Sequence, residues 1–228
     1  MSPSPPSPPD GGRRGRLAAR VHRSERYPWI VLTAALVGLF SVGFSITVLS
    51  IAIPKIAGEF DASVNVMIWI ITGPILLGAI LTPSFGKVAD VLGARRVYLA
   101  SMFVVAVCAG LAAVSWNATS LILFRILGGA MGAATGPASI AVINRLFPAE
   151  KRAQALGYWS MVAAGGPVIG ALVGGPVVDY VNWRWIFIAQ VPLSLATVAV
   201  CAVVFPDTPR DRSTSAPMTG PPAATIDQ

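Results

Sequence analysis

The sequence predicts an all-α membrane protein with six transmembrane helices. Hydrophobic residues make up 54% of the 228 residues and charged residues only 12%, whereas soluble domains carry about 25% charged residues. The apolar residues gather in six long stretches. Each stretch approaches or exceeds the ~20 residues that a helix needs to cross ~30 Å of hydrocarbon.

The apolar segments define a membrane domain, residues 28–205, with a tail on either side. The segments cover residues 29–53, 67–85, 97–114, 121–143, 155–178 and 185–205. The first is too long for a signal peptide and has no small-residue cleavage site behind it. We expect helices throughout, because an unpaired backbone group in lipid costs several kcal/mol and no barrel-like alternation is present.

The two tails, residues 1–27 and 206–228, are rich in Pro, Ser and charged residues. Segments of this composition cannot bury enough apolar surface to fold, so we expect both to be disordered. Fourteen of the 17 Lys and Arg residues lie in these tails or in the loops on the same side of the predicted topology. Basic residues gather on the cytoplasmic side of membrane proteins, so both termini are expected in the cytoplasm.

Membrane orientation also accounts for the net charge of +7, and no nucleic-acid partner is expected. The basic first tail can rest on anionic lipid of the bilayer. Arginine far outnumbers lysine, 14 to 3, as in proteins from GC-rich bacterial genomes. The expected location is therefore a bacterial cytoplasmic (plasma) membrane, with the chain crossing it several times.

The spacing of the six segments indicates an internal repeat. The second and fifth segments, and the third and sixth, begin 88 residues apart (67 to 155, 97 to 185), and the first and fourth begin 92 apart (29 to 121). Three helices followed by three of opposite topology form the 3+3 inverted repeat of secondary transporters. Short loops alone also produce even spacing, which is the alternative interpretation.

The connection between the second and third segments, residues 86–96, reads GKVADVLGARR. Gly86 allows close helix approach, Gly93 permits a tight turn, and Asp90 is an acceptor near helix ends and basic side chains. The stretch resembles the G-x-L-A-D-R-x-G-R-R loop of the major facilitator superfamily. An ordinary basic inner loop, the alternative, requires Arg95 and Arg96 but neither Asp90 nor the glycines.

The resemblance implies a cytoplasmic latch that engages charge and a helix end in the other half of a complete transporter. The candidate latch residues are Gly86, Asp90, Gly93, Arg95 and Arg96. Two arginines of the family motif are replaced here by Val91 and Ala94, which weakens the expected charge network.

Arg125 lies inside the fourth apolar segment, and a charge in a membrane segment is a functional-site hypothesis by default. Residues 121–129, LILFRILGG, resemble the family's L-x-x-x-R-x-x-Q-G motif, with Gly128 in place of glutamine and Gly129 at the motif's glycine. Arg125 lies only ~7 Å along the segment. Snorkelling to the outer surface is therefore the alternative to a place in a substrate cavity.

The fifth segment carries GGPVIGALVGG, residues 165–175. Gly166, Gly170 and Gly174 recur every four residues and form a ridge that lets helices approach closely. Pro167 leaves a carbonyl without its helical donor and should kink the helix. On the residues alone we interpret these positions, with Gly129, as hinge and packing sites. The run is also similar to the G-P-x-x-G-G signature of the antiporter branches of the superfamily.

Two further runs resemble the drug/proton antiporter branch with fourteen helices. Residues 183–192, WRWIFIAQVP, resemble its W-R-W-I-F-L-I-N-V-P, and residues 45–54, SITVLSIAIP, resemble its D-x-T-I-V-N-V-A-L-P. The resemblance implies that the chain is the amino-terminal six-helix half of a major facilitator fold. Ser45 stands where the branch has aspartate, and Ser50 where it has asparagine.

The sequence places no carboxylate and no histidine in the predicted helix cores, whereas proton coupling needs such a group inside the membrane. Any substrate cavity should therefore favour neutral or anionic amphipathic compounds, with Arg125 and Ser45 as the candidate contacts. The sequence has no motif of an enzyme, a metal site or a cofactor site. Cys108 and Cys201 are expected to be packed thiols.

Two functions are consistent with this sequence. One is a half-size transporter of small amphipathic molecules, of the drug or metabolite efflux type, which needs a second six-helix half from a homodimer or a separate chain. The other is a non-transporting truncated or regulatory membrane protein of the same family. Alternating access requires two halves around the substrate site, so a stable partner and transport in vesicles discriminate between them.

Overall fold

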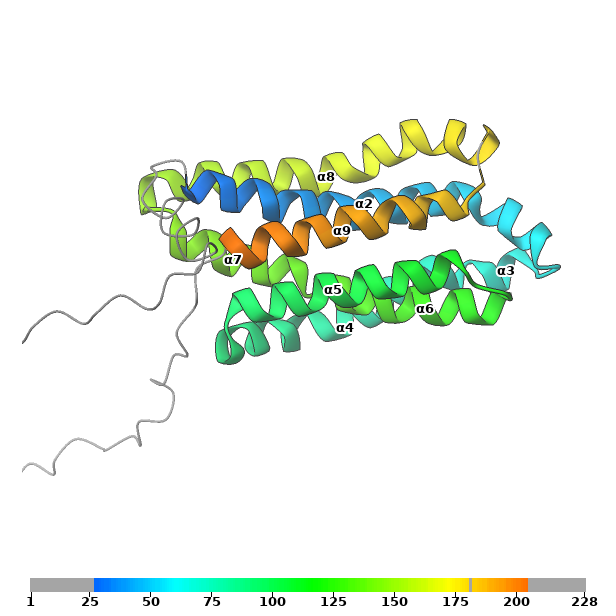
Figure 1. Ribbon diagram of the computed structural model, residues 1–228, viewed down its shortest axis with the longest axis horizontal. Helices are drawn as coiled ribbons and strands as arrows, with labels where there is room; N and C mark the ends of the chain where they lie inside the picture. Colours follow the sequence, from blue (N-terminus) through cyan, green and yellow to red (C-terminus); the bar gives the residue numbers. More distant parts are fainter. Residues whose placement is uncertain (1–26, 181, 205–228) are drawn as a thin grey trace, which may run out of the picture.

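A computed structural model describes residues 27–180 and 182–204, and these residues form helices joined by short turns (Figure 1). The helices are α2 (Tyr27–Glu59), α3 (Val64–Met67), α4 (Trp69–Leu92), α5 (Ala94–Ala113), α6 (Ala118–Gly132), α7 (Thr135–Leu146), α8 (Ala149–Tyr180) and α9 (Arg184–Val204). Almost all of both predicted tails lies outside the described residues.

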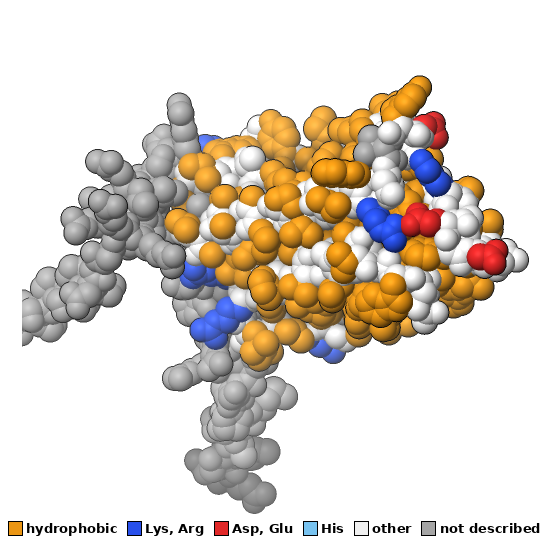
Figure 2. Space-filling model, turned by 45° about the vertical axis from the view of Figure 1, so that its right-hand side comes forward, with side chains coloured by type: hydrophobic (Ala, Val, Ile, Leu, Met, Phe, Trp, Pro, Cys, Tyr) orange, Lys and Arg blue, Asp and Glu red, His pale blue; other side chains and the backbone are white. Residues whose placement is uncertain are grey.

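Six stretches of helix are long and apolar enough to cross a membrane, as the sequence predicted. Four are single helices, and two combine a pair: α3 with α4, and α6 with α7. Figure 2 shows a broad hydrophobic band between charged side chains at the two ends of the bundle. That band is the surface expected to face lipid.

Several helices extend beyond the apolar segments that predicted them. Helix α2 runs through Pro54 to Glu59, and α4 continues to Leu92. The expectation of a loop over residues 86–96 was therefore wrong: Gly93 alone makes the turn before α5. Its φ of 93° is a backbone conformation that glycine adopts at no steric cost, so one residue suffices to reverse the chain.

The fourth apolar segment was predicted as one uninterrupted helix, but the structure divides it into α6 and α7. At the junction the Ala134 amide donates to the Met131 carbonyl at 3.1 Å, three residues back instead of four. The Thr135 hydroxyl donates to the Gly132 carbonyl at 2.7 Å. A tightened turn and a side chain that bonds the backbone commonly bend a helix.

The helix pairings follow the 3+3 inverted repeat. The first span of repeat one, α2, packs on the second span of repeat two, α8. In the same way the first span of repeat two, α6, packs on the second span of repeat one, α4. The third members, α5 and α9, pack on each other. Exchanging the two repeats reproduces this pattern, so the fold is an all-α membrane domain with inverted-repeat topology.

A glycine–proline pair lies at each of the two equivalent crossings. At the α2–α8 crossing, a methyl group added at Gly43 would lie 3.3 Å from the Pro167 ring. At the α4–α6 crossing, a methyl group added at Gly129 would overlap Pro74. Close helix approach through small residues is the usual way to pack helices in lipid, and here it occurs twice in matching places.

The two ends of the bundle carry different charges. The end where α2 begins and α9 finishes, which we call the terminal end, bears the basic side chains Lys87, Arg95, Arg96, Arg145, Lys151 and Arg152. At the opposite end, Glu59 accepts hydrogen bonds from Trp183 Nε1 and Arg184 Nη1, both at 2.5 Å. Arg184 Nη2 also donates to the Ser115 carbonyl at 3.0 Å. This outer cluster ties α2, α9 and the turn after α5 together.

Candidate functional site

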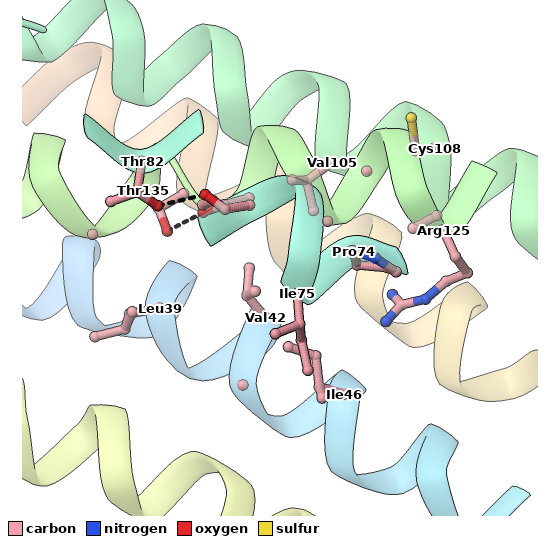
Figure 3. Close-up of a pocket in the computed structure, with 18 of the residues that line it drawn as sticks. Leu39, Val42, Ile46, Pro74, Ile75, Thr82, Val105, Cys108, Arg125 and Thr135 are labelled. Atoms are coloured by element: carbon pink, nitrogen blue, oxygen red, sulfur yellow. Dashed lines mark hydrogen bonds between the residues drawn. The ribbon is translucent and has the colours of Figure 1, made fainter. Parts of the chain in front are cut away.

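A cavity of about 350 Å³ lies between the two equivalent crossings (Figure 3). Its wall consists mainly of apolar side chains and of the glycine backbone of α6 and α7. Polar lining comes from Thr82, Thr135, Trp159, Arg125 and Gln190. The two threonine hydroxyls donate to helix carbonyls at 2.7 Å, and Trp159 Nε1 donates to the Ser139 hydroxyl at 2.9 Å. Arg125 and Gln190 remain as the polar groups best placed to meet a ligand.

Arg125 reaches this cavity from α6. Asn117 caps the helix by accepting the Ser120 amide at 2.7 Å, which fixes where the helix begins. The arginine side chain is only 8% exposed, and its guanidinium carbon lies 5.6 Å from the centroid of the Phe187 ring on α9. Arg125 thus points inward, as Figure 3 shows, and does not extend along the surface.

The charge of Arg125 has no counter-ion in the described part of the chain. Its Nε has no hydrogen-bond partner. The acidic residues in the described ranges are all exposed, and none lines the cavity: Glu59, Asp61, Asp90, Glu150 and Asp179. An arginine keeps its proton, and a buried cation is stable only when it meets an anion or strong acceptors. The cavity is therefore suited to an acceptor group.

Gln190 is a cavity residue that the sequence analysis missed. It lies on α9, one turn beyond Phe187, and is 6% exposed. Its Oε1 is buried without a hydrogen-bond partner. A polar amide inside an apolar membrane segment carries the same signal that identified Arg125, so the residue type alone could have flagged it.

Ser45 lies elsewhere: it is 1% exposed on α2 and does not line the cavity, although Val42, Gly43 and Ile46 beside it do. Its hydroxyl has no partner. A methyl group added at Gly38 would lie 3.1 Å from Thr197. Helices α2 and α9 are antiparallel, Ser45 lies seven residues after Gly38, and Gln190 lies seven residues before Thr197. Ser45 and Gln190 are therefore at the same height in the bundle. The structure therefore brings Ser45 toward α9 and not into the cavity.

The glycine ridge of the fifth span faces α2. A methyl group at Gly170 would lie 2.9 Å from the Phe44 carbonyl oxygen, and one at Gly174 would lie 3.2 Å from the Val48 Cα. A methyl group at Gly166 would lie 3.5 Å from the Phe40 carbonyl oxygen. The ridge packs backbone against backbone, and Pro167 lies within the continuous helix α8.

The latch candidates lie at the terminal end, away from Arg125. Gly86 and Asp90, on the last turns of α4, line a second cavity of about 670 Å³ that also includes Arg145. Arg95 donates to the Ala202 carbonyl at 2.5 Å and so caps the end of α9 with positive charge. Arg96 is exposed.

Six spans in an inverted repeat, with a cavity and a buried cation between equivalent crossings, are features of the fold that secondary transporters share. The sequence matches the family model of the Major Facilitator Superfamily over residues 35–227. The chain belongs to the Major Facilitator Superfamily.

Its relatives include exporters of small molecules. The chain is 35% identical over 172 residues to the multidrug export protein EmrB of Haemophilus influenzae, covering 75% of this chain and 34% of that protein. It is 30% identical over 205 residues to the tetracenomycin C resistance and export protein of Streptomyces glaucescens, covering 90% and 36%.

Among solved structures, the inward-open xylose transporter XylE from E. coli superposes with a TM-score of 0.68 at 16% identity, covering 80% of this chain and 49% of that one. At this identity the likeness shows the fold alone. The chain spans about a third of the length of these curated relatives and about half of the solved transporter. The predicted family and the predicted six-helix half are therefore confirmed.

Proposed function

We propose that this chain is one half of a transporter that exports small amphipathic molecules of the drug or metabolite type. The observation that carries the proposal is the 350 Å³ cavity with the buried, unpaired Arg125, because a cation without a partner inside a membrane marks a substrate or ion site. The names of the relatives, a multidrug export protein and a tetracenomycin C resistance and export protein, support the efflux direction.

The proposed transporter has a second six-helix half. The cavity is open on one side, where Ile75 on its wall is 54% exposed. Transporters of this class bind substrate between two six-helix halves and alternate access by rocking one against the other. A partner that covers this side would complete the cavity.

The charge of the cavity selects the substrate. Arg125 is the only charged residue among those that line it in the described ranges. A cationic compound would meet uncompensated repulsion at this site, whereas an anionic or neutral compound with a strong acceptor would satisfy the guanidinium. The proposed substrates are therefore neutral or anionic amphipathic molecules.

The moving parts lie outside the cavity. We assign the latch to Gly86, Asp90, Gly93, Arg95 and Arg96 at the terminal end, which the positive-inside rule places in the cytoplasm. The close contacts of Gly166, Gly170 and Gly174 with α2 suit a rigid half that rocks as a unit, since packed helices resist continuous deformation.

Transport in everted membrane vesicles tests the proposal. Vesicles that contain the chain should accumulate the anionic dye 1-anilinonaphthalene-8-sulfonate above empty vesicles, and Arg125→Met should reduce the initial rate about tenfold or more, because a charge-assisted contact contributes roughly 1.5–3 kcal/mol. The cationic dye ethidium should not accumulate.

The control variant is Gly165→Ala, at a helix position with open space around it, which should transport like the parent chain. Dye movement that does not depend on Arg125, or preferential movement of ethidium, would contradict the assignment of the cavity. If no dye moves even when a six-helix carboxyl-terminal half of a relative is supplied, the chain is the non-transporting or regulatory protein.

A further inference from the structure

We infer that Arg125 and Gln190 form a two-point polar subsite that binds a neutral carboxamide-type group, a carbonyl oxygen next to an N–H. The inference rests on the proposed function, and it names the class of substrate group that the cavity binds. Both side chains line the same cavity, and both are more than nine-tenths buried.

The two side chains leave unsatisfied groups of opposite kind. Arg125 Nε is a donor without an acceptor, and Gln190 Oε1 is an acceptor without a donor. A buried polar group without a partner costs about 1–3 kcal/mol, so a ligand that satisfies both gains more than one that satisfies either. Such a ligand must bring an acceptor and a donor close together.

Phe187 on α9 relates the positions of the two side chains. The Arg125 guanidinium carbon lies 5.6 Å from the Phe187 ring centroid, and Gln190 lies three residues, about 4.5 Å, further along α9. The last torsion of a glutamine is soft, so the amide can turn its oxygen toward a ligand without moving its helix. A carboxamide carries the acceptor for the guanidinium and the donor for the glutamine oxygen on adjacent atoms.

The rest of the cavity suits a flat apolar body. Its α6 wall includes Gly128, Gly129 and Gly132. Methyl groups added there would lie against Cys108, Pro74 and Val42, so the helices around the cavity approach one another closely. Opposite lie apolar side chains of α2 such as Val42 and Ile46. An aromatic carboxamide is therefore the ligand class with the best fit.

A matched pair of probes tests the subsite: 2-naphthamide and methyl 2-naphthoate. Both are neutral and share the ring system and the carbonyl, but only the amide has a donor. The purified full chain in nanodiscs should bind the amide about tenfold more tightly than the ester, as one added hydrogen bond predicts. Equilibrium dialysis against empty nanodiscs of the same lipid measures both affinities.

The variants assign the preference to its residues. Gln190→Met, which keeps the length of the side chain, should lower amide affinity to that of the ester and leave the ester unchanged. Arg125→Met should weaken both probes. Ser194→Ala is the matched control, because Ser194 is buried four residues further along α9, also without a partner, and does not line the cavity.

Three results would overturn the subsite: equal affinity of the two probes for the parent chain, an amide preference that survives Gln190→Met, or no binding above empty nanodiscs. The first needs no variant, so a misfolded mutant does not affect it. An amide preference without dye transport, even when a carboxyl-terminal half of a relative is supplied, would retain the subsite and reject the proposed function. Dye transport without the amide preference would reject the subsite alone.

Discussion

Arg125 and Gln190 show what residue type alone reveals in a membrane protein. A charged or amide side chain is expensive in hydrocarbon, so its presence in an apolar segment predicts an inward position without any structure. That argument located Arg125, and the same argument applies to Gln190. It could not place Ser45, because a serine hydroxyl can bond its own helix or face a neighbour at similar cost.

The outer cluster was also beyond the reach of sequence. Glu59 and Arg184 are 125 residues apart, and either could have been an ordinary exposed charge at a helix end. Only the antiparallel packing of α2 and α9 brings them together with Trp183. The Arg184 guanidinium carbon lies 4.5 Å from the centroid of the Trp183 ring, a distance typical of a cation–π contact.

Removing the carboxylate should loosen this end of the bundle. We expect Glu59→Gln to lower the free energy of unfolding by about 1 kcal/mol, because Glu59 loses its charge-assisted bond to Arg184 while its side chain is partly exposed. Unfolding by sodium dodecyl sulfate in mixed micelles measures the change. Asp61→Asn at the same end is the control, and an equal loss in both variants would refute a specific role for the cluster.

At the scale of elements, the existence and type of the six spans followed from hydropathy, whereas their ends and breaks did not. Hydropathy locates the part of a helix that lies in lipid. The helix itself continues into water until its hydrogen bonding is interrupted, as α4 does up to Gly93. The α6–α7 break depends on the Thr135 hydroxyl and on tightened bonding near Gly132, and glycine or threonine in a membrane helix is too common to predict one.

The glycine ridge of α8 makes a quantitative prediction about packing. Gly170→Ala should destabilise the chain by about 1–3 kcal/mol, because the added methyl group would lie 2.9 Å from the Phe44 carbonyl oxygen and the two helices must separate to admit it. Gly165→Ala, five residues earlier in the same helix and with nothing within 4 Å, should be neutral or stabilising.

Thermal unfolding of the two variants in detergent makes this comparison directly, since both change glycine to alanine in the same helix. A similar loss of stability in both would show that flexibility of the helix matters and that close contact with α2 does not. Because Gly129 meets Pro74 at the equivalent crossing, Gly129→Ala should behave like Gly170→Ala.

For the molecule as a whole, the inverted repeat links the local features. The α2–α8 and α4–α6 crossings use the same glycine–proline contact, Gly43 with Pro167 and Gly129 with Pro74, and the cavity lies between them. The motif resemblance pointed to Pro167 alone, and equal spacing of the segments could not reveal its counterpart. The pairing of Pro74 with Gly129 became visible only when the helices were placed in space.

The orientation of the whole domain can be tested with single added cysteines. Lys151 is exposed at the terminal end, and Gly58 is exposed near the opposite end of α2. The native Cys108 and Cys201 are both buried, at 7% and 0% exposed, so the parent chain should give little background labelling. The excess of Lys and Arg at the terminal end predicts that this end lies in the cytoplasm.

A membrane-impermeant maleimide applied to intact cells should therefore label Gly58→Cys and leave Lys151→Cys unlabelled until the membrane is permeabilised. Both variants should be labelled fully in detergent, which controls for access to the thiol. The opposite pattern would place the terminal end outside. The latch assignment at Asp90 would then fail, since coupling of the end of α4 to the other half is proposed for the cytoplasmic face. Labelling of both variants in intact cells would instead show that the chain inserts in two orientations, as a weak charge bias would allow.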